Sequence, residues 1–311
     1  MEEREEMEEF TFKTNKGIDI KTYKWIPEGE IKAAVQISHG MNEHILRYDE
    51  FASFLASNGY LVYGNDHLGH GQSKLDGESL GYISDEDGFV DMLDEMRCLT
   101  DIIKKENPGT KLFMFAHSMG SFLAQRYIQI YGEELYGLIL SGTNGEPPSA
   151  IDMGISLSKI IIKTRGRRHL SKLINLLAFG SYNKKFKPRR TIFDWISSDE
   201  DEVDKYIEDP LCGNLFPASF FHDLFVGMKE VQKDENLEKV PENLPIYIFA
   251  GNDDPVGNYG EGIVNLYKTY KNYGIKDLEY KLYKSGRHEM LNEKNKKEVI
   301  EDNLDWLERK L

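Results

Sequence analysis

The feature that most constrains the fold of this 311-residue chain is a serine that ends an apolar run. Residues 112–116 are apolar and predict a buried strand, whereas residues 122–127 contain no helix breaker and predict a helix. Ser118 would then lie on a sharp strand-to-helix turn, which is the geometry of a nucleophile elbow. Such a strained turn requires small neighbours, and Ala116 and Gly120 meet that requirement. The alternative is that Ser118 only caps the helix, where serine is also favoured.

Segments on both sides of this turn alternate between strand and helix patterns. Apolar runs and period-two patterns predict strands at residues 10–13, 18–26, 31–38, 61–65, 112–116, 136–141, 245–251 and 278–283. Helices are predicted at residues 48–55, 85–106, 122–127, 262–273 and 294–311. This alternation is typical of βαβ units, so we predict an α/β fold with a mostly parallel central sheet flanked by helices.

Residues 146–243 interrupt that alternation. They show no strand pattern, and apolar residues fall at helical spacing, as at Leu170, Leu173, Ile174 and Leu177. Strand patterns resume at residue 245. We therefore predict an α/β core formed by residues 1–145 and 244–311. Residues 146–243 would be inserted between two core strands as a helical cap, or lid, over an active site.

Charge is distributed unevenly along the chain. The formal net charge of −14 argues against general affinity for nucleic acid, which requires a basic surface. Residues 153–193 nevertheless contain no aspartate or glutamate and eleven basic residues: Lys159, Lys163, Arg165, Arg167, Arg168, Lys172, Lys184, Lys185, Lys187, Arg189 and Arg190. A basic cap suits peripheral contact with an anionic lipid surface. The alternative, equally open, is that these cations neutralise the acidic remainder of the chain.

Signals for export, membrane insertion and metal binding are not found in the sequence. The first residues lack the basic start and apolar run of a secretory signal, and no segment offers 18 uninterrupted apolar residues. We therefore expect a cytoplasmic protein, either free or peripheral to a membrane. Cys98 and Cys212 match no metal-ligand or redox spacing and are expected to be reduced and structural. The group Asp66, His67 and His70 fits a glycine-rich turn better than a metal site, so no metal is expected.

A nucleophilic serine requires a general base and an acid that orients the base. In this fold class the chain order is serine, acid, histidine. Three histidines follow Ser118 in the sequence. His169 and His222 lie in the insertion, whereas His288 follows the last predicted strand and is therefore the candidate base.

The orienting acid is expected after the first strand beyond the insertion, where Asp253 and Asp254 are neighbours. We favour Asp254 because Pro255 follows it and stiffens the loop that must aim the carboxylate. Less suitable substitutes are Asp277 and Glu289. The serine, the acid and the histidine each follow the carboxyl end of a predicted strand, where the sites of open α/β sheets lie.

The strand at residues 31–38 is followed by His39 and then by a glycine. Gly40 leaves the backbone free to turn a following N–H inward, and in serine hydrolases this position supplies an oxyanion-hole donor. A plain strand-to-helix loop is the alternative for this segment.

Five motifs follow one another along nearly the whole chain. They are His39-Gly40-Met41-Asn42-Glu43-His44 with Arg47-Tyr48, Asp66-His67-Leu68-Gly69-His70-Gly71-Gln72-Ser73, Ala116-His117-Ser118-Met119-Gly120, Gly251 to Val256, and Gly286-Arg287-His288-Glu289. In order and spacing they resemble the α/β-hydrolase superfamily, specifically the monoacylglycerol lipase and bacterial lysophospholipase group, also classed as serine aminopeptidase-like hydrolases. Ala116 and Ser121 stand where that group usually has glycine.

The resemblance implies that Ser118 is the nucleophile, Asp254 the acid and His288 the base, with the N–H groups of Met41 and Met119 forming the oxyanion hole. It implies a serine carboxylic ester hydrolase that acts through an acyl-enzyme on a single-acyl lipid, such as monoacylglycerol or lysophospholipid, without a metal or organic cofactor. The alternatives are an aminopeptidase or amidase with the same triad, and a non-catalytic lipid-binding member of the fold.

Overall fold

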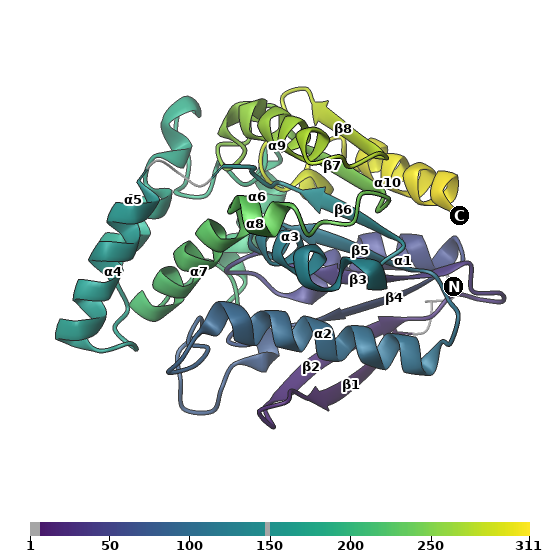
Figure 1. The fold of residues 1–311 in the computed structure, drawn as a ribbon. Helices are drawn as coiled ribbons and strands as arrows, with labels where there is room; N and C mark the ends of the chain where they lie inside the picture. The colour runs from purple at the N-terminus through teal and green to yellow at the C-terminus, as the bar shows by residue number, and fades with distance from the viewer. Residues whose placement is uncertain (1–6, 147–149) are drawn as a thin grey trace.

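The computed structural model describes residues 7–146 and 150–311, and its centre is one eight-stranded sheet (Figure 1). The strands lie in the order β1-β2-β4-β3-β5-β6-β7-β8. Their bounds are β1 Met7–Lys13, β2 Asp19–Trp25, β3 Ala33–Ser38, β4 Tyr60–Asn65, β5 Leu112–His117, β6 Gly137–Ser141, β7 Ile246–Gly251 and β8 Leu278–Tyr283. β1, β2 and β4 pair antiparallel, and every pairing from β4 across to β8 is parallel. The predicted α/β fold with a mostly parallel sheet is confirmed.

Helices flank this sheet and fill the long segment between β6 and β7. Those in the described part of the chain are α1 Asp49–Ser57, α2 Gly88–Glu106, α3 Met119–Tyr131, α4 Ile151–Arg165, α5 Lys172–Phe179, α6 Glu200–Glu208, α7 Ala218–Val231, α8 Asp234–Leu237, α9 Glu261–Asn272 and α10 Lys296–Lys310. The helix predicted from residue 85 begins at Gly88 instead, because the Asp87 side chain accepts hydrogen bonds from the N–H groups of Phe89 and Val90. None of these helices combines the length and the apolar character needed to cross a membrane.

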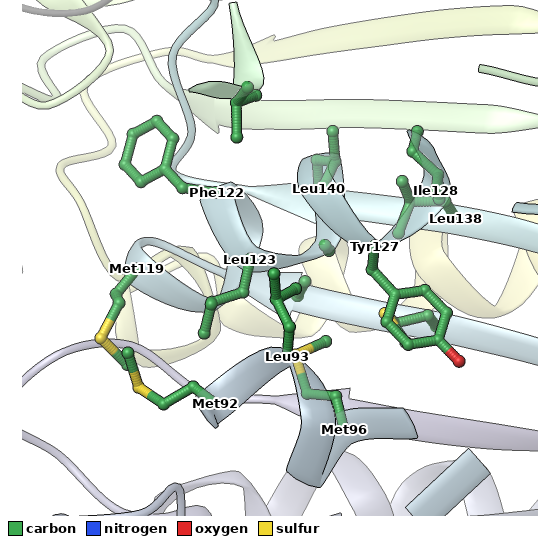
Figure 2. Packing of buried hydrophobic residues seen from close by; sticks show 14 of the residues in the cluster. Met92, Leu93, Met96, Met119, Phe122, Leu123, Tyr127, Ile128, Leu138 and Leu140 are labelled. Atoms are coloured by element: carbon green, nitrogen blue, oxygen red, sulfur yellow. The ribbon is translucent and has the colours of Figure 1, made fainter. Parts of the chain in front are cut away.

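Two hydrophobic clusters cover the two faces of the sheet. Alternation along β5 sends Phe113 and Phe115 to the cluster that contains α1 and α10, and Met114 to the cluster that contains α2, α3 and α9. Figure 2 shows how α2 packs against α3 and β6 in the cluster that contains α2, α3 and α9. The residues in contact there are Met92, Leu93, Met96, Met119, Leu123, Tyr127, Leu138 and Leu140. Both faces of the sheet are therefore packed against helices. Because β5 to β8 run parallel, the carboxyl ends of β5, β7 and β8 lie at the same edge of the sheet.

The segment between β6 and β7 carries helices α4 to α8. α4 and α5 stand away from the sheet at the left of Figure 1, whereas α7 packs against α2 and α3. Phe220, Phe221 and Leu224 of α7 are buried in the same cluster as those two helices. The division of the chain into a core and a separate cap stays a prediction, because part of the insertion completes the hydrophobic cluster of the sheet.

One helix in this segment is shorter than its apolar pattern predicts. The spacing places Leu170 on a helix face, but α5 begins only at Lys172. The hydroxyl of Ser171 accepts a hydrogen bond from the N–H of Ile174 and so starts the helix there. Leu170 instead pairs with Pro217 in an isolated β-bridge.

Candidate active site

Ser118 occupies the turn between β5 and α3 in a strained conformation, with φ 51° and ψ −118°. A positive φ is uncommon for a residue other than glycine and costs conformational energy, so the surrounding structure must enforce it. The Ser118 side chain makes no capping hydrogen bond to the helix, and its Oγ lies 2.9 Å from Nε2 of His288 instead. The alternative that Ser118 serves only as a helix cap is therefore wrong.

Small neighbours allow this turn to pack closely. A Cβ at Gly120 would overlap the carbonyl oxygens of Ser38 and His39, so only glycine lets the first turn of α3 lie against the end of β3. Ala116 is fully buried on β5. The strand, turn and helix expected around Ser118 are all present.

The loops after β7 and β8 bring an acid and a histidine to this serine. Nδ1 of His288 lies 3.0 and 3.1 Å from the two carboxylate oxygens of Asp254, which is fully buried. Because a carboxylate only accepts hydrogen bonds, Nδ1 donates its proton, and Nε2 is left to accept the hydroxyl of Ser118. The N–H of Val256 donates to Oδ1 of Asp254 at 2.8 Å and helps to fix the carboxylate. The three candidates thus form one line of hydrogen bonds, and their catalytic roles remain a proposal.

The other acids considered from the sequence are placed differently. His288 hydrogen-bonds to Asp254 and not to Asp253. Asp277 pairs with Lys310 at 2.7 Å. Glu289 hydrogen-bonds to Arg47 rather than to the imidazole of His288. The geometry therefore favours Asp254 among the four acids.

The pKa values of two neighbouring histidines are shifted in opposite directions. Burial acts to lower the pKa of His288, but the charge of Asp254 and the hydrogen bond to it outweigh that effect, so the pKa is raised above 6.5. Burial and the proximity of His288 hold the pKa of His117 well below 6.5. His117 is therefore neutral at neutral pH, and His288 is the group suited to receive a proton from Ser118.

Met41 and Met119 line the same cavity as the serine, and the N–H of neither donates a hydrogen bond to a described residue. The peptide before Met41 is held on both sides. Nδ1 of His39 donates to the Gly40 carbonyl at 2.7 Å, and the N–H of Gly40 donates to Glu43 at 2.5 Å. Because the peptide unit is planar, fixing the Gly40 carbonyl also fixes the direction of the Met41 N–H. Both N–H groups are available to an anionic oxygen, and their assignment as an oxyanion hole remains a proposal.

A buried ion cluster joins this loop to the histidine loop. Arg47 donates to Glu43 at 2.8 Å and binds both oxygens of Glu289 at 2.8 and 2.6 Å. Burial raises the pKa of Glu43. Burial also opposes ionisation of Glu289, but Arg47 outweighs it and holds the pKa of that carboxyl below its ordinary value. The motif that contains Arg47 gave no sign of this role, because the partner lies 242 residues further along the chain.

One histidine after β4, His67, supports the fold. Nε2 of His67 hydrogen-bonds to the Ser38 hydroxyl at 2.9 Å, and Nδ1 hydrogen-bonds to Glu95.

Both cysteines are free, as expected. The expectation that no metal binds stays a prediction, because one group in the described part of the chain has potential ligand atoms within 4.8 Å of one another: His44, Asp209 and Cys212. In that group His44 and Asp209 already hydrogen-bond to each other at 2.7 Å.

The serine opens into a cavity of about 1110 Å³ between the end of the sheet and the insertion. Small-molecule sites commonly measure about 300–1,000 Å³, so this cavity has room for a long ligand. The insertion supplies mostly apolar walls, among them Leu157, Leu177, Phe179, Trp195, Phe221 and Phe225. The site can therefore hold an extended apolar chain next to the hydroxyl of Ser118.

Known proteins share both the sequence and the shape of this chain. The serine aminopeptidase S33 family profile matches residues 29–295. The monoglyceride lipase homolog of monkeypox virus is 28% identical over 91% of this chain and 92% of its own length. The monoglyceride lipase of Homo sapiens is 28% identical over 85% of this chain and 78% of its own length. A carboxyl esterase from Bacillus coagulans, solved in complex with glycerol, superimposes with a TM-score of 0.91 at 29% identity, covering 97% of this chain and 98% of that one. This chain belongs to the serine aminopeptidase S33 family of α/β-hydrolases, in its monoacylglycerol lipase-like group.

Proposed function

We propose that this protein hydrolyses carboxylic esters of single-acyl lipids, such as monoacylglycerol or lysophospholipid, through an acyl-enzyme on Ser118. The observation that carries this proposal is the line of hydrogen bonds from Asp254 through His288 to Ser118, which ends in a largely apolar cavity. The esterase and lipase relatives support an ester hydrolase, and monoglyceride lipases among them support a monoacylglycerol as substrate.

The proposed mechanism follows from the direction of each hydrogen bond. Nε2 of His288 accepts the proton of Ser118 as the serine Oγ attacks the ester carbonyl. The N–H groups of Met41 and Met119 stabilise the oxyanion. His288 then gives the proton to the leaving alcohol, and a water activated by the same imidazole releases the fatty acid from the serine.

The carboxylates around the cavity favour this reaction over an aminopeptidase, which must hold a substrate ammonium. Three glutamates among the described residues line the cavity: Glu43, Glu146 and Glu289. Glu43 and Glu289 already form ion pairs with Arg47. Glu146 alone remains for an ammonium group, and its described partner is the amide of Asn265 at 3.3 Å.

A substrate panel tests the proposed function directly. Burial of each additional CH₂ contributes about 0.8 kcal/mol, so kcat/KM for p-nitrophenyl esters should rise about fourfold per methylene until the chain fills the cavity. Monoacylglycerol and lysophospholipid distinguish the two head groups, and an aminoacyl anilide tests the peptidase. Faster cleavage of the anilide than of every ester would contradict an esterase. The absence of both turnover and fluorophosphonate labelling would favour the non-catalytic binding protein.

The basic residues on and just after α4 differ in whether the protein neutralises them. Arg167 binds Asp223 at 2.8 Å, and Arg168 binds Glu78 at 2.8 Å and Asp85 at 3.0 Å, so these two cations are neutralised by the protein itself. Lys159, Lys163 and Arg165 are exposed and have no carboxylate partner among the described residues. Exposed apolar side chains accompany them on α4 and α5: Met153, Ile160, Leu173, Leu176 and Leu177. We propose that α4 and α5, rather than the whole basic segment, make the peripheral contact with a lipid surface.

Charge removal tests this contact. The triple variant Lys159→Gln, Lys163→Gln, Arg165→Gln should bind anionic vesicles more weakly at low salt and show a flatter salt dependence, because exposed charges are screened over about 8 Å at physiological salt. Vesicle co-sedimentation across a salt series measures both effects. A matched control removes three exposed lysines elsewhere on the protein: Lys105 of α2, Lys268 of α9 and Lys294 before α10. Equal losses in the two triple variants would show that only net charge matters, and the contact through α4 and α5 would be rejected.

A further inference from the structure

The imidazole of His288 contacts two aromatic rings. The ring centroid of His117, at the end of β5, is 4.7 Å away with an interplanar angle of 47°. The indole centroid of Trp195, from the insertion, is 5.0 Å away with an interplanar angle of 39°. The candidate base therefore packs against one ring from the core and one ring from the insertion.

Trp195 is fixed in place by the backbone around it. We call residues 194–198 the clasp, because this stretch hydrogen-bonds to the loop that carries His288. The N–H of His288 donates to the Trp195 carbonyl at 3.4 Å, and the N–H of Glu289 donates to the Ile196 carbonyl at 2.8 Å. The guanidinium of Arg287 donates to the carbonyls of Asp194 and Ser197. The clasp and the histidine loop therefore form one hydrogen-bonded unit.

Two further aromatic rings pack against the indole of Trp195. Phe179 of α5 stacks on Trp195 with ring centroids 6.1 Å apart and an interplanar angle of 8°. Tyr182 meets the indole edge-on at 4.9 Å. Together with the contact to His288, these two contacts leave the indole little freedom to rotate.

We propose that Trp195 is a positioning residue for the general base. Its indole holds the His288 ring in the orientation that reaches Ser118 and Asp254 together, and its face stabilises the imidazolium that forms when the serine loses its proton. The negative face of an indole attracts a cation, most strongly where water is excluded. This inference rests on the proposed triad and adds to it a residue that no sequence motif contains.

The charges around His288 define what the indole adds. Asp254, Glu289 and Glu43 favour the imidazolium by their negative charge, and they raise its pKa against the effect of burial. His117 is neutral and offers no such attraction. The carboxylates thus stabilise the imidazolium by their charge, and the proposed contribution of Trp195 comes from its uncharged aromatic face.

Two substitutions separate the aromatic face from simple bulk. Trp195→Leu keeps an apolar side chain but removes the ring, whereas Trp195→Phe retains a smaller ring. The rate of fluorophosphonate inactivation of the free enzyme, measured against pH, reports the protonation of His288 without a choice of lipid substrate. Trp195→Leu should react about tenfold more slowly and shift the acid limb of the profile down by about half to one pH unit. Trp195→Phe should recover most of both losses.

A neighbouring aromatic residue supplies the control. Phe193 lies two positions earlier, and its ring packs against Tyr206 at 5.1 Å rather than against His288. Phe193→Leu should leave the acid limb where it is in the parent. An unmoved limb in Trp195→Leu, or equal shifts in the Leu and Phe variants of Trp195, would overturn the inference. Failure of the parent to react with the fluorophosphonate at Ser118 would instead refute the proposed function.

A second measurement requires no substitution at Trp195. A protonated imidazole in contact with an indole quenches its fluorescence, so the emission of the parent should rise as pH increases through the titration of His288. The other two tryptophans, Trp25 and Trp306, are buried among other aromatic residues. The titration should vanish in His288→Gln. Its persistence in that variant would show that Trp195 does not sense His288, and the proposal would fail.

Discussion

Ser118→Ala is expected to reduce ester hydrolysis on the order of 10⁶-fold, the loss associated with removing a serine nucleophile from an intact site. The fold should remain, because the Ser118 side chain makes no capping hydrogen bond that alanine would lose. We expect a change of less than about 1 kcal/mol in the free energy of unfolding. Steady-state hydrolysis, fluorophosphonate labelling and thermal denaturation measure these effects together.

A neighbouring serine provides the matched control for this variant. The hydroxyl of Ser121 donates to the Ser118 carbonyl at 2.5 Å and accepts from the Thr143 hydroxyl, 2.7 Å away, and so supports the turn without facing His288. Ser121→Ala should keep covalent labelling at Ser118. If Ser118→Ala retained substantial hydrolysis, the elbow would not supply the nucleophile.

Asp254→Asn should lower turnover on the order of 10⁴-fold, whereas Asp253→Asn should have little effect. Asparagine can donate to Nδ1 of His288 and so favours the tautomer whose Nε2 carries a proton and cannot accept one from Ser118. Asp253 does not contact the imidazole, and it tests the same loop with the same chemical change. Comparable losses in both variants would argue against the choice of Asp254.

The pH profile gives this pair a second readout. Asp254 raises the pKa of His288 above 6.5, so removing its charge should lower that pKa. Hydrolysis requires the neutral imidazole, so the acid limb of the residual activity should move to lower pH. Asp253→Asn should leave the limb in place. An acid limb that moved only in Asp253→Asn would reverse the assignment.

The sequence predicted the parts of the site that local rules control. The tight turn at Ser118 requires small residues two positions before and two positions after it. These residues, the strand before the turn and the helix after it can all be recognised from consecutive residues. The chain order of Ser118, Asp254 and His288 follows from the alternation of strands and helices, which places the carboxyl ends of β5, β7 and β8 at one edge. The proline after Asp254 was enough to choose the aspartate that the structure directs at the histidine.

Contacts between segments that are distant in the chain could not be predicted, because they leave no pattern in the sequence. Arg47 binds Glu289 only because the loop after β3 and the loop after β8 meet at the same edge of the sheet. Trp195 has no periodicity or motif that marks it, since its position depends on the clasp and on stacking with Phe179. The pairing of Arg167 and Arg168 with acids elsewhere likewise depends on how the insertion packs. Composition could show that the segment is basic, but not which cations are already neutralised.

The clasp also bears on how relatives of this chain could diverge or be recombined. Exchange of the whole insertion for that of another hydrolase would remove both the backbone that supports His288 and the α7 side chains that complete a hydrophobic cluster. Exchange of α4 and α5 alone would keep the clasp and α7, at the loss of the Phe179 contact with Trp195 unless an aromatic residue were retained there. A recombination that spares the clasp and α7 therefore keeps the hydrogen bonds to the histidine loop and the packing against α2 and α3.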